Sequence, residues 1–134
     1  MKMELLFPKP TKELRQVVTV IHSDWPASKK AVRCEAVWDT GSSVTIVTER
    51  LAGALGMRRA DGVKMMLHAG TGNAMSDGYE AWLALQPGEQ PVKVIVAVMP
   101  QPDTDVLIGM DVICRGRFEI DATGSDTIMR FEMP

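Results

Sequence analysis

The sequence predicts a single all-β domain, a closed barrel or a sandwich, with one or two short helices. Many short runs of apolar or alternating residues recur along the chain, and turns containing Gly and Pro separate them. Helical signals are confined to two brief stretches. The chain has 134 residues, the size of one domain, and 46% of them are hydrophobic, enough for one core. We therefore expect residues 1–134 to form one domain.

The predicted strands follow one another at short intervals. The first, Gln16–His22, is mostly apolar, and Ala31–Trp38 alternates apolar with polar residues after a turn that contains Pro26. A turn at residues 86–89, with Pro and Gly in adjacent positions, separates two later strands. The remaining strand candidates are Val44–Val47, Val63–Leu67, Tyr79–Leu85, Val92–Val98, Val106–Ile108, Phe118–Ile120 and Ile128–Met133.

Two short helices interrupt this pattern. Thr48 can cap the first helix, because a Thr hydroxyl accepts a hydrogen bond from an N–H of the first turn. Leu51 and Leu55 then share one face, and Gly56 follows the end, where a left-handed residue is common. The second helix is predicted over Met110–Cys114.

Charge and cysteine content argue against several classes of protein. The formal charge is −2, so the chain lacks the basic surplus of a nucleic-acid binder. No apolar run approaches the ~20 residues of a membrane span, and the first residues lack a secretory apolar segment. The two cysteines, Cys34 and Cys114, are too few for a disulfide framework, which suggests a cytoplasmic protein. Together with His22 and His68 they lack zinc-ligand spacing, so no metal is expected.

One motif carries candidate chemistry. An apolar strand runs directly into Asp39-Thr40-Gly41, and a second strand, Val44–Val47, begins three residues after Gly41. Asp and Gly are common turn residues, so the tripeptide alone also fits an ordinary turn at the end of a strand. Further along the chain, the apolar pair Leu107-Ile108 ends in Gly109 at the start of the second helix. A glycine-rich hairpin candidate lies between these two segments.

This order of segments resembles the retropepsin-like aspartic proteases of retroviruses, retrotransposons and some bacteria. The resemblance covers about Gln16 to Met133 and rests on the Asp-Thr-Gly strand, the hairpin, and the apolar pair with Gly before a helix. It implies a closed acid-protease barrel and an endopeptidase that uses neither metal nor cofactor. Two residues depart from the family pattern: Trp38 replaces a smaller aliphatic residue, and Met110 replaces the Arg of retroviral enzymes.

The resemblance also implies roles for the residues of the motif. Asp39 becomes the catalytic carboxylate, and the hydroxyl of Thr40 bonds across to the partner loop. Gly41 lets the backbone turn beneath the carboxylates. We expect the Ser42 hydroxyl to donate a hydrogen bond to Asp39, which would favour the ionised form and lower the pKa of the catalytic pair. Asp111 is interpreted as a carboxylate stabilised at a helix N-terminus and not as a second catalytic group.

The hairpin between the motifs corresponds in the family to a flap that covers the substrate. Glycines at its tip would let the backbone approach an extended peptide. An ordinary exposed hairpin is the alternative, and a dinucleotide fingerprint is disfavoured because the third Gly is missing. The predicted flap residues are His68, Ala69, Gly70, Thr71, Gly72 and Asn73.

A single Asp-Thr-Gly supplies only half of a catalytic pair. An active enzyme would therefore be a homodimer that acts on polypeptides, with no nucleic acid or membrane as partner. We expect the chain ends, Met3–Phe7 and Ile128–Met133, to pair across the two-fold axis, so that deletion of Thr127–Pro134 yields an inactive monomer. Pairing of the last strand within its own protomer is the alternative. The alternative function is a non-catalytic peptide-binding or dimerisation module with the same fold.

Overall fold

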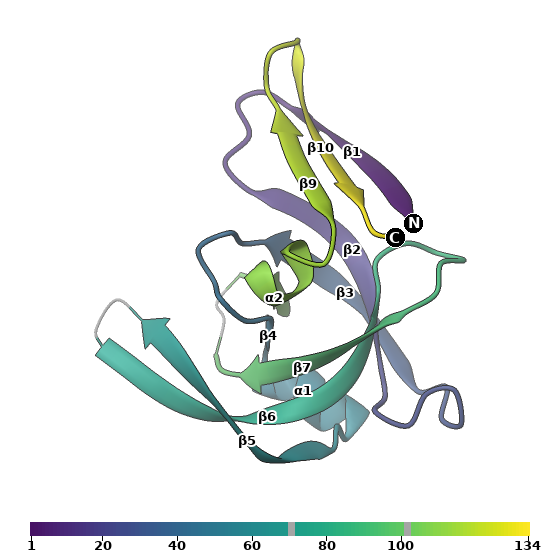
Figure 1. The fold of residues 1–134 in the computed structure, drawn as a ribbon, viewed down its shortest axis with the longest axis vertical. Helices are drawn as coiled ribbons and strands as arrows, with labels where there is room; N and C mark the ends of the chain where they lie inside the picture. The colour runs from purple at the N-terminus through teal and green to yellow at the C-terminus, as the bar shows by residue number, and fades with distance from the viewer. Residues whose placement is uncertain (70–71, 101–102) are drawn as a thin grey trace.

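The computed structural model describes residues 1–69, 72–100 and 103–134, which form two sheets and two short helices (Figure 1). No helix in this part of the chain has the length and apolar character needed to cross a bilayer. In chain order the elements are β1 (Lys2–Pro8), β2 (Leu14–Ile21), β3 (Ala31–Trp38), β4 (Ile46–Val47), α1 (Glu49–Leu55), β5 (Arg59–Ala69), β6 (Gly72–Ala84), β7 (Val92–Val98), β8 (Val106–Ile108), α2 (Met110–Ile113), β9 (Arg117–Asp121) and β10 (Asp126–Glu132).

The larger sheet closes into a ring. Its strand order is β2-β3-β8-β4-β7-β6-β5, and β2 also pairs with β6 over Thr19–Ile21 and Trp82–Ala84. Six strands therefore form the ring, and β5 lies outside it as a further strand on β6. The ring and the two short helices confirm the predicted all-β closed barrel.

Both predicted helices are present, and their ends follow the expected signals. Thr48 caps α1 by accepting a hydrogen bond from the Leu51 N–H. Gly56 adopts a left-handed conformation with φ of 64°, which an L side chain would strain. Leu51 and Leu55 are fully buried, so α1 closes one side of the core. The predicted strands are also present, although β5 and β6 are longer than their predicted segments.

The smaller sheet combines both ends of the chain. Its order is β1-β10-β9, and β10 pairs along its whole length with β1, from Lys2 with Glu132 to Pro8 with Asp126. Figure 1 shows the two termini side by side, and the Met133 N–H donates to the Met1 carbonyl at 2.9 Å. The expectation that the last strand pairs across a two-fold axis is therefore wrong for β10, because both of its edges are occupied within the chain.

Trp38 joins the two sheets. Its side chain is 4% exposed and lies against Phe118 and Phe131, with ring centroids 5.6 and 5.1 Å away. The indole N–H, which needs a partner when buried, donates to Gln16 Oε1 at 2.7 Å. The large residue before Asp39 thus fills the space between the barrel and the terminal sheet, where a smaller aliphatic side chain would leave a cavity.

Candidate active site

Asp39 stands at the end of β3, where the chain leaves the barrel. Its backbone N–H donates to the Ile108 carbonyl at 2.8 Å, so the carboxylate-bearing residue is fixed to β8. The side chain is half-buried, whereas Thr40 and Gly41 are exposed. Gly41 donates its N–H to Asp39 Oδ1 at 2.9 Å, and a Cβ at this glycine would lie 3.2 Å from the same oxygen. The motif therefore presents one oriented carboxylate on a surface loop.

Strand β8 and the start of α2 contact this loop and support it. β8 runs parallel to β3 and antiparallel to β4, so it lies between the strand that enters the motif and the strand that leaves it. The Met110 N–H donates to the Ser42 carbonyl at 2.8 Å. A Cβ at Gly109 would lie 2.4 Å from the Val44 carbonyl oxygen, closer than any side chain could come. The Leu107-Ile108-Gly109 segment therefore supports the loop directly.

Ser42 does not make the hydrogen bond expected from the sequence. Its hydroxyl donates to the Val44 carbonyl at 2.6 Å instead of to Asp39. The proton of a hydroxyl serves one acceptor at a time, and the carbonyl two residues ahead is within easy reach. Ser42 thus stabilises the turn of the loop and has no direct bond to the carboxylate.

Asp111 has more contacts than a residue that only neutralises a helix N-terminus. Its Oδ1 accepts from the Val112 N–H at 2.9 Å, which agrees with the expected position in the first turn. The same carboxylate also accepts from the Thr45 hydroxyl at 2.7 Å and the Thr45 N–H at 3.0 Å. Sequence reasoning missed Thr45. The only signal for it was a polar residue inside the apolar segment Val44–Val47.

The predicted flap corresponds to the tip of the long β5–β6 hairpin, which projects from the ring in Figure 1. His68 pairs with Asn73 and Ala69 with Gly72, so the backbone register continues to the tip. Gly70 and Thr71 lie outside the described residues. Closer to the barrel, Leu67 is buried against Ile46 and Ala97, and Val44 borders this apolar group. The hairpin thus packs on the segment that follows the Asp39 loop.

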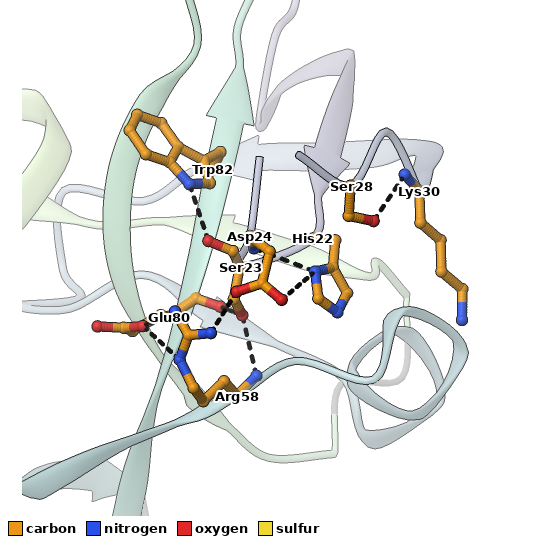
Figure 2. A network of polar contacts seen from close by, with 8 residues as sticks. All are labelled: His22, Ser23, Asp24, Ser28, Lys30, Arg58, Glu80 and Trp82. Carbon is orange, nitrogen blue, oxygen red and sulfur yellow. Dashed lines mark hydrogen bonds and ion pairs between the residues drawn. The ribbon is translucent and has the colours of Figure 1, made fainter. Parts of the chain in front are cut away.

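A polar network fixes the base of this hairpin to the β2–β3 turn (Figure 2). Arg58 pairs with Glu80 on β6 at 2.7 Å and with Asp24 in the turn. The Ser23 hydroxyl donates to the Glu80 carbonyl at 2.5 Å and accepts the Arg58 N–H at 2.9 Å. The Arg58 guanidinium lowers the pKa of Asp24 and of Glu80 below their ordinary values by hydrogen bonding. The network therefore anchors one end of the hairpin on the barrel wall.

A groove of about 640 Å³ lies beside the motif. Asp39 and Thr40 form part of its wall, so the carboxylate lines a space large enough for side chains of a bound chain. The other lining residues come from the segment before β2 and the start of β2, the end of β3, the β7–β8 connection, β8, and β9 and β10 with the turn between them: Thr11, Lys12, Glu13, Leu14, Arg15, Val37, Trp38, Asp103, Thr104, Leu107, Ile120, Ala122 and Thr127.

The structure offers no obvious metal centre in the part of the chain that it describes. There, no three His, Cys, Asp or Glu side chains gather in a way that could hold an ion. Cys34 and Cys114 are both free, and burial raises the pKa of the Cys34 thiol to about 11, which makes it a poor ligand and nucleophile at neutral pH.

Comparison with known proteins agrees with this geometry. A family model described as "gag-polyprotein putative aspartyl protease" matches residues 27–115, more than half of the chain. These residues include the Asp39 loop, the β5–β6 hairpin and the segment from β8 into α2. No curated protein matches the sequence.

Two solved structures resemble the fold at low sequence identity. A retropepsin-like aspartic protease from Rickettsia conorii has a TM-score of 0.57 and 14% identity, with 98% of this chain and 93% of that chain covered. The EIAV protease in complex with the inhibitor HBY-793 has a TM-score of 0.54 and 16% identity, with 79% and 89% covered. The matched family and the shared architecture lead to one conclusion: this chain belongs to the gag-polyprotein aspartyl protease family and has the retropepsin-like fold.

Proposed function

We propose that this protein is an aspartic endopeptidase that cleaves extended polypeptides and is active as a homodimer. The observation that carries the proposal is the single Asp-Thr-Gly loop, with Asp39 half-buried at the end of β3 and its neighbours exposed. One carboxylate cannot both activate a water molecule and protonate the scissile carbonyl. A second Asp39, from a symmetry-related protomer, completes the pair.

The two carboxylates would share one proton, because like charges a few ångströms apart resist simultaneous ionisation. The ionised Asp39 accepts a proton from the attacking water, and the protonated Asp39 donates its proton to the carbonyl oxygen of the peptide. The carboxyl group that took the water proton then donates it to the peptide nitrogen as the C–N bond breaks, and a hydroxyl of the tetrahedral intermediate returns a proton to the other carboxylate.

The exposed side of the loop fits a contact with a second protomer. The hydroxyl of Thr40 is free to reach the partner loop, as the family resemblance implies, and Gly41 permits a close backbone approach. Ile120 is 51% exposed and lines the same groove as Asp39, so an apolar surface borders the proposed seam. Dimerisation would cover this surface and create the catalytic pair at the same time.

The β5–β6 hairpin would cover the substrate. An extended polypeptide would lie across Asp39, with residues 68–73 above its backbone. The main-chain N–H and C=O groups of a hairpin can hydrogen-bond such a peptide. We propose that residues 1–134 act as one domain in the cytoplasm, without metal or cofactor, and that the thiols of Cys34 and Cys114 remain reduced.

The decisive experiment combines a cleavage assay with a measurement of mass in solution. The wild-type protein should cleave members of a peptide library in a pepstatin-sensitive manner and should sediment as a dimer. Asp39→Asn should abolish cleavage and leave the fold intact, because the amide cannot share the proton. The matched control is Asp126→Asn, an equivalent change at an exposed position of β10, which should keep full activity.

Cleavage by the Asp39→Asn protein at the wild-type rate would refute the assignment. A folded wild-type protein that binds peptides without cleaving them would support a binding module instead.

A further inference from the structure

The carboxylate of Asp111 has an unusual set of partners for a half-buried charge. Oδ1 accepts from the Thr45 hydroxyl at 2.7 Å and from the Val112 N–H at 2.9 Å, and Oδ2 accepts from the Thr45 N–H at 3.0 Å. Among the described residues, no Lys, Arg or His lies within ion-pair distance of it. Three neutral donors therefore satisfy the charge, and two of them belong to Thr45.

Thr45 is held on several sides at once. Its side chain is buried, with 1% of the residue exposed, and its hydroxyl oxygen also accepts the Gly109 N–H at 3.2 Å. Its carbonyl accepts the Ala97 N–H at 3.0 Å, which ties it to β7. Thr45 is thus a fixed point in the barrel wall, and Asp111 supplies the two bonds that link this point to α2.

This fixed point is one end of the loop that carries the proposed catalytic carboxylate. The other end is the bond from the Asp39 N–H to the Ile108 carbonyl, and one bond from Met110 to Ser42 supports the middle. Thr40, Gly41 and Ser43 are exposed, and the bonds within the loop, from Gly41 and Ser42 to Asp39 and from Ser42 to Val44, do not tie it to the barrel. The position of Asp39 relative to the barrel therefore depends on how firmly these attachments are held.

We propose that Asp111 is a positioning residue for the proposed proteolytic reaction. By clamping Thr45 through two oxygens, it sets the path of residues 39–45 and so the orientation in which each protomer presents Asp39 to its partner. This inference rests on the proposed function. A misplacement of about 1 Å at a reacting group can cost on the order of 100-fold in rate, and two copies of the loop must meet in an active dimer.

A carboxylate suits this clamp better than an amide of the same shape. Both oxygens of Asp111 receive hydrogens, whereas Asn has one oxygen and an NH₂ group that only donates. In Asp111→Asn, the NH₂ group would face either the Thr45 N–H or the Val112 N–H, so one of these donors would lose its acceptor. The variant keeps the size of the side chain and removes one arm of the clamp, so it tests the carboxylate rather than the volume.

The chain offers a matched control at the other end of β4. There, Asp105 Oδ1 accepts from the Thr48 hydroxyl at 3.0 Å, the same Thr–Asp pairing in a half-buried setting. This pair lies at the N-terminus of α1 and also includes Arg50, away from the loop of residues 39–45. Asp105→Asn thus removes equivalent chemistry and leaves both attachments of the loop in place.

The experiment measures loop protection and catalysis on the same dimeric preparations. Hydrogen exchange of peptides that cover residues 39–45 should become faster in Asp111→Asn and in Thr45→Val, whereas Asp105→Asn should leave it as in the wild type. The rate constant kcat should fall on the order of 100-fold in both loop variants with little change in KM, because substrate contacts remain. Thr45→Ser keeps the hydroxyl. This variant should therefore retain most of the wild-type protection of residues 39–45 and most of the wild-type kcat, even if Thr45→Val folds poorly.

Each outcome separates the positioning role from a merely structural one. Wild-type exchange and kcat in Asp111→Asn would overturn the proposal. Equal losses of kcat in Asp111→Asn and Asp105→Asn, in proportion to their unfolding temperatures, would also overturn it. If the wild-type protein cleaves nothing, the proposed function fails, and the exchange of residues 39–45 still decides whether Asp111 holds the loop.

Discussion

Deletion of residues 127–134 is expected to unfold the protomer rather than to release a folded monomer. The deletion removes most of the central strand of the β1-β10-β9 sheet, including Met129 and Phe131, which are 0% and 1% exposed. Truncation of a buried Met to Ala costs about 2–5 kcal/mol, and of a buried Phe about 3–5 kcal/mol. The sum is comparable to the roughly 5–15 kcal/mol that stabilises a whole domain. Trp38 would also lose the Phe131 ring against which it packs.

The assay is urea unfolding followed by tryptophan fluorescence and circular dichroism, with sedimentation of the same samples. The truncated chain should show no cooperative transition. A graded variant, Phe131→Ala, should unfold cooperatively at a much lower urea concentration than the wild type. Leu6→Ala, at a residue that is 63% exposed on the neighbouring strand, is the control and should change stability by less than ~0.5 kcal/mol. A truncated protein that sediments as a monomer and unfolds cooperatively would refute this reasoning.

Two further predictions concern polar contacts. Ser42→Ala should leave the acid limb of the pH–rate profile in place and cost about 0.5–1.5 kcal/mol in stability, because its hydroxyl bonds the Val44 carbonyl and not Asp39; a shifted acid limb in the variant would contradict this. The second compares urea midpoints of the wild type and Arg58→Leu from pH 7 to pH 3. Arg58 lowers the pKa of Glu80 below 4.5 and that of Asp24 below 3.8, so its stabilising effect is complete above these values and is lost as the pH falls through the lower, folded-state values. The two midpoints should therefore converge in acid, and a constant difference would show that the pairing contributes no pH dependence.

The elements of the fold that could be predicted from the sequence are those that residues close together in the chain determine. Alternating strands, the Thr48 cap and Gly56 each act within a few residues, so their patterns can be read along the chain. The sequence placed Gly109 at the end of an apolar pair, but its close approach to the Val44 carbonyl is visible only in the structure. These local signals were sufficient to predict the barrel.

The errors concern contacts between segments that are distant in sequence or have equivalent local alternatives. The pattern of β10 shows an apolar face but not which strands occupy its edges, and both edges are filled within the chain. The Ser42 hydroxyl had two acceptors within reach, and composition cannot rank them. Thr45 and Asp111 are 66 residues apart, so only the three-dimensional structure brings the clamp into view.

The adjacency of the two termini makes a circular permutation of this protein feasible. Because the ammonium of Met1 lies 2.9 Å from the Met133 carbonyl, a short linker could join the ends without disturbing the β1-β10-β9 sheet. New ends could then be opened in the exposed turn at residues 86–89, between β6 and β7. In such a circular permutant, β10 and β1 would become consecutive strands of one hairpin, and the Asp39 loop would remain far from both new ends of the sequence.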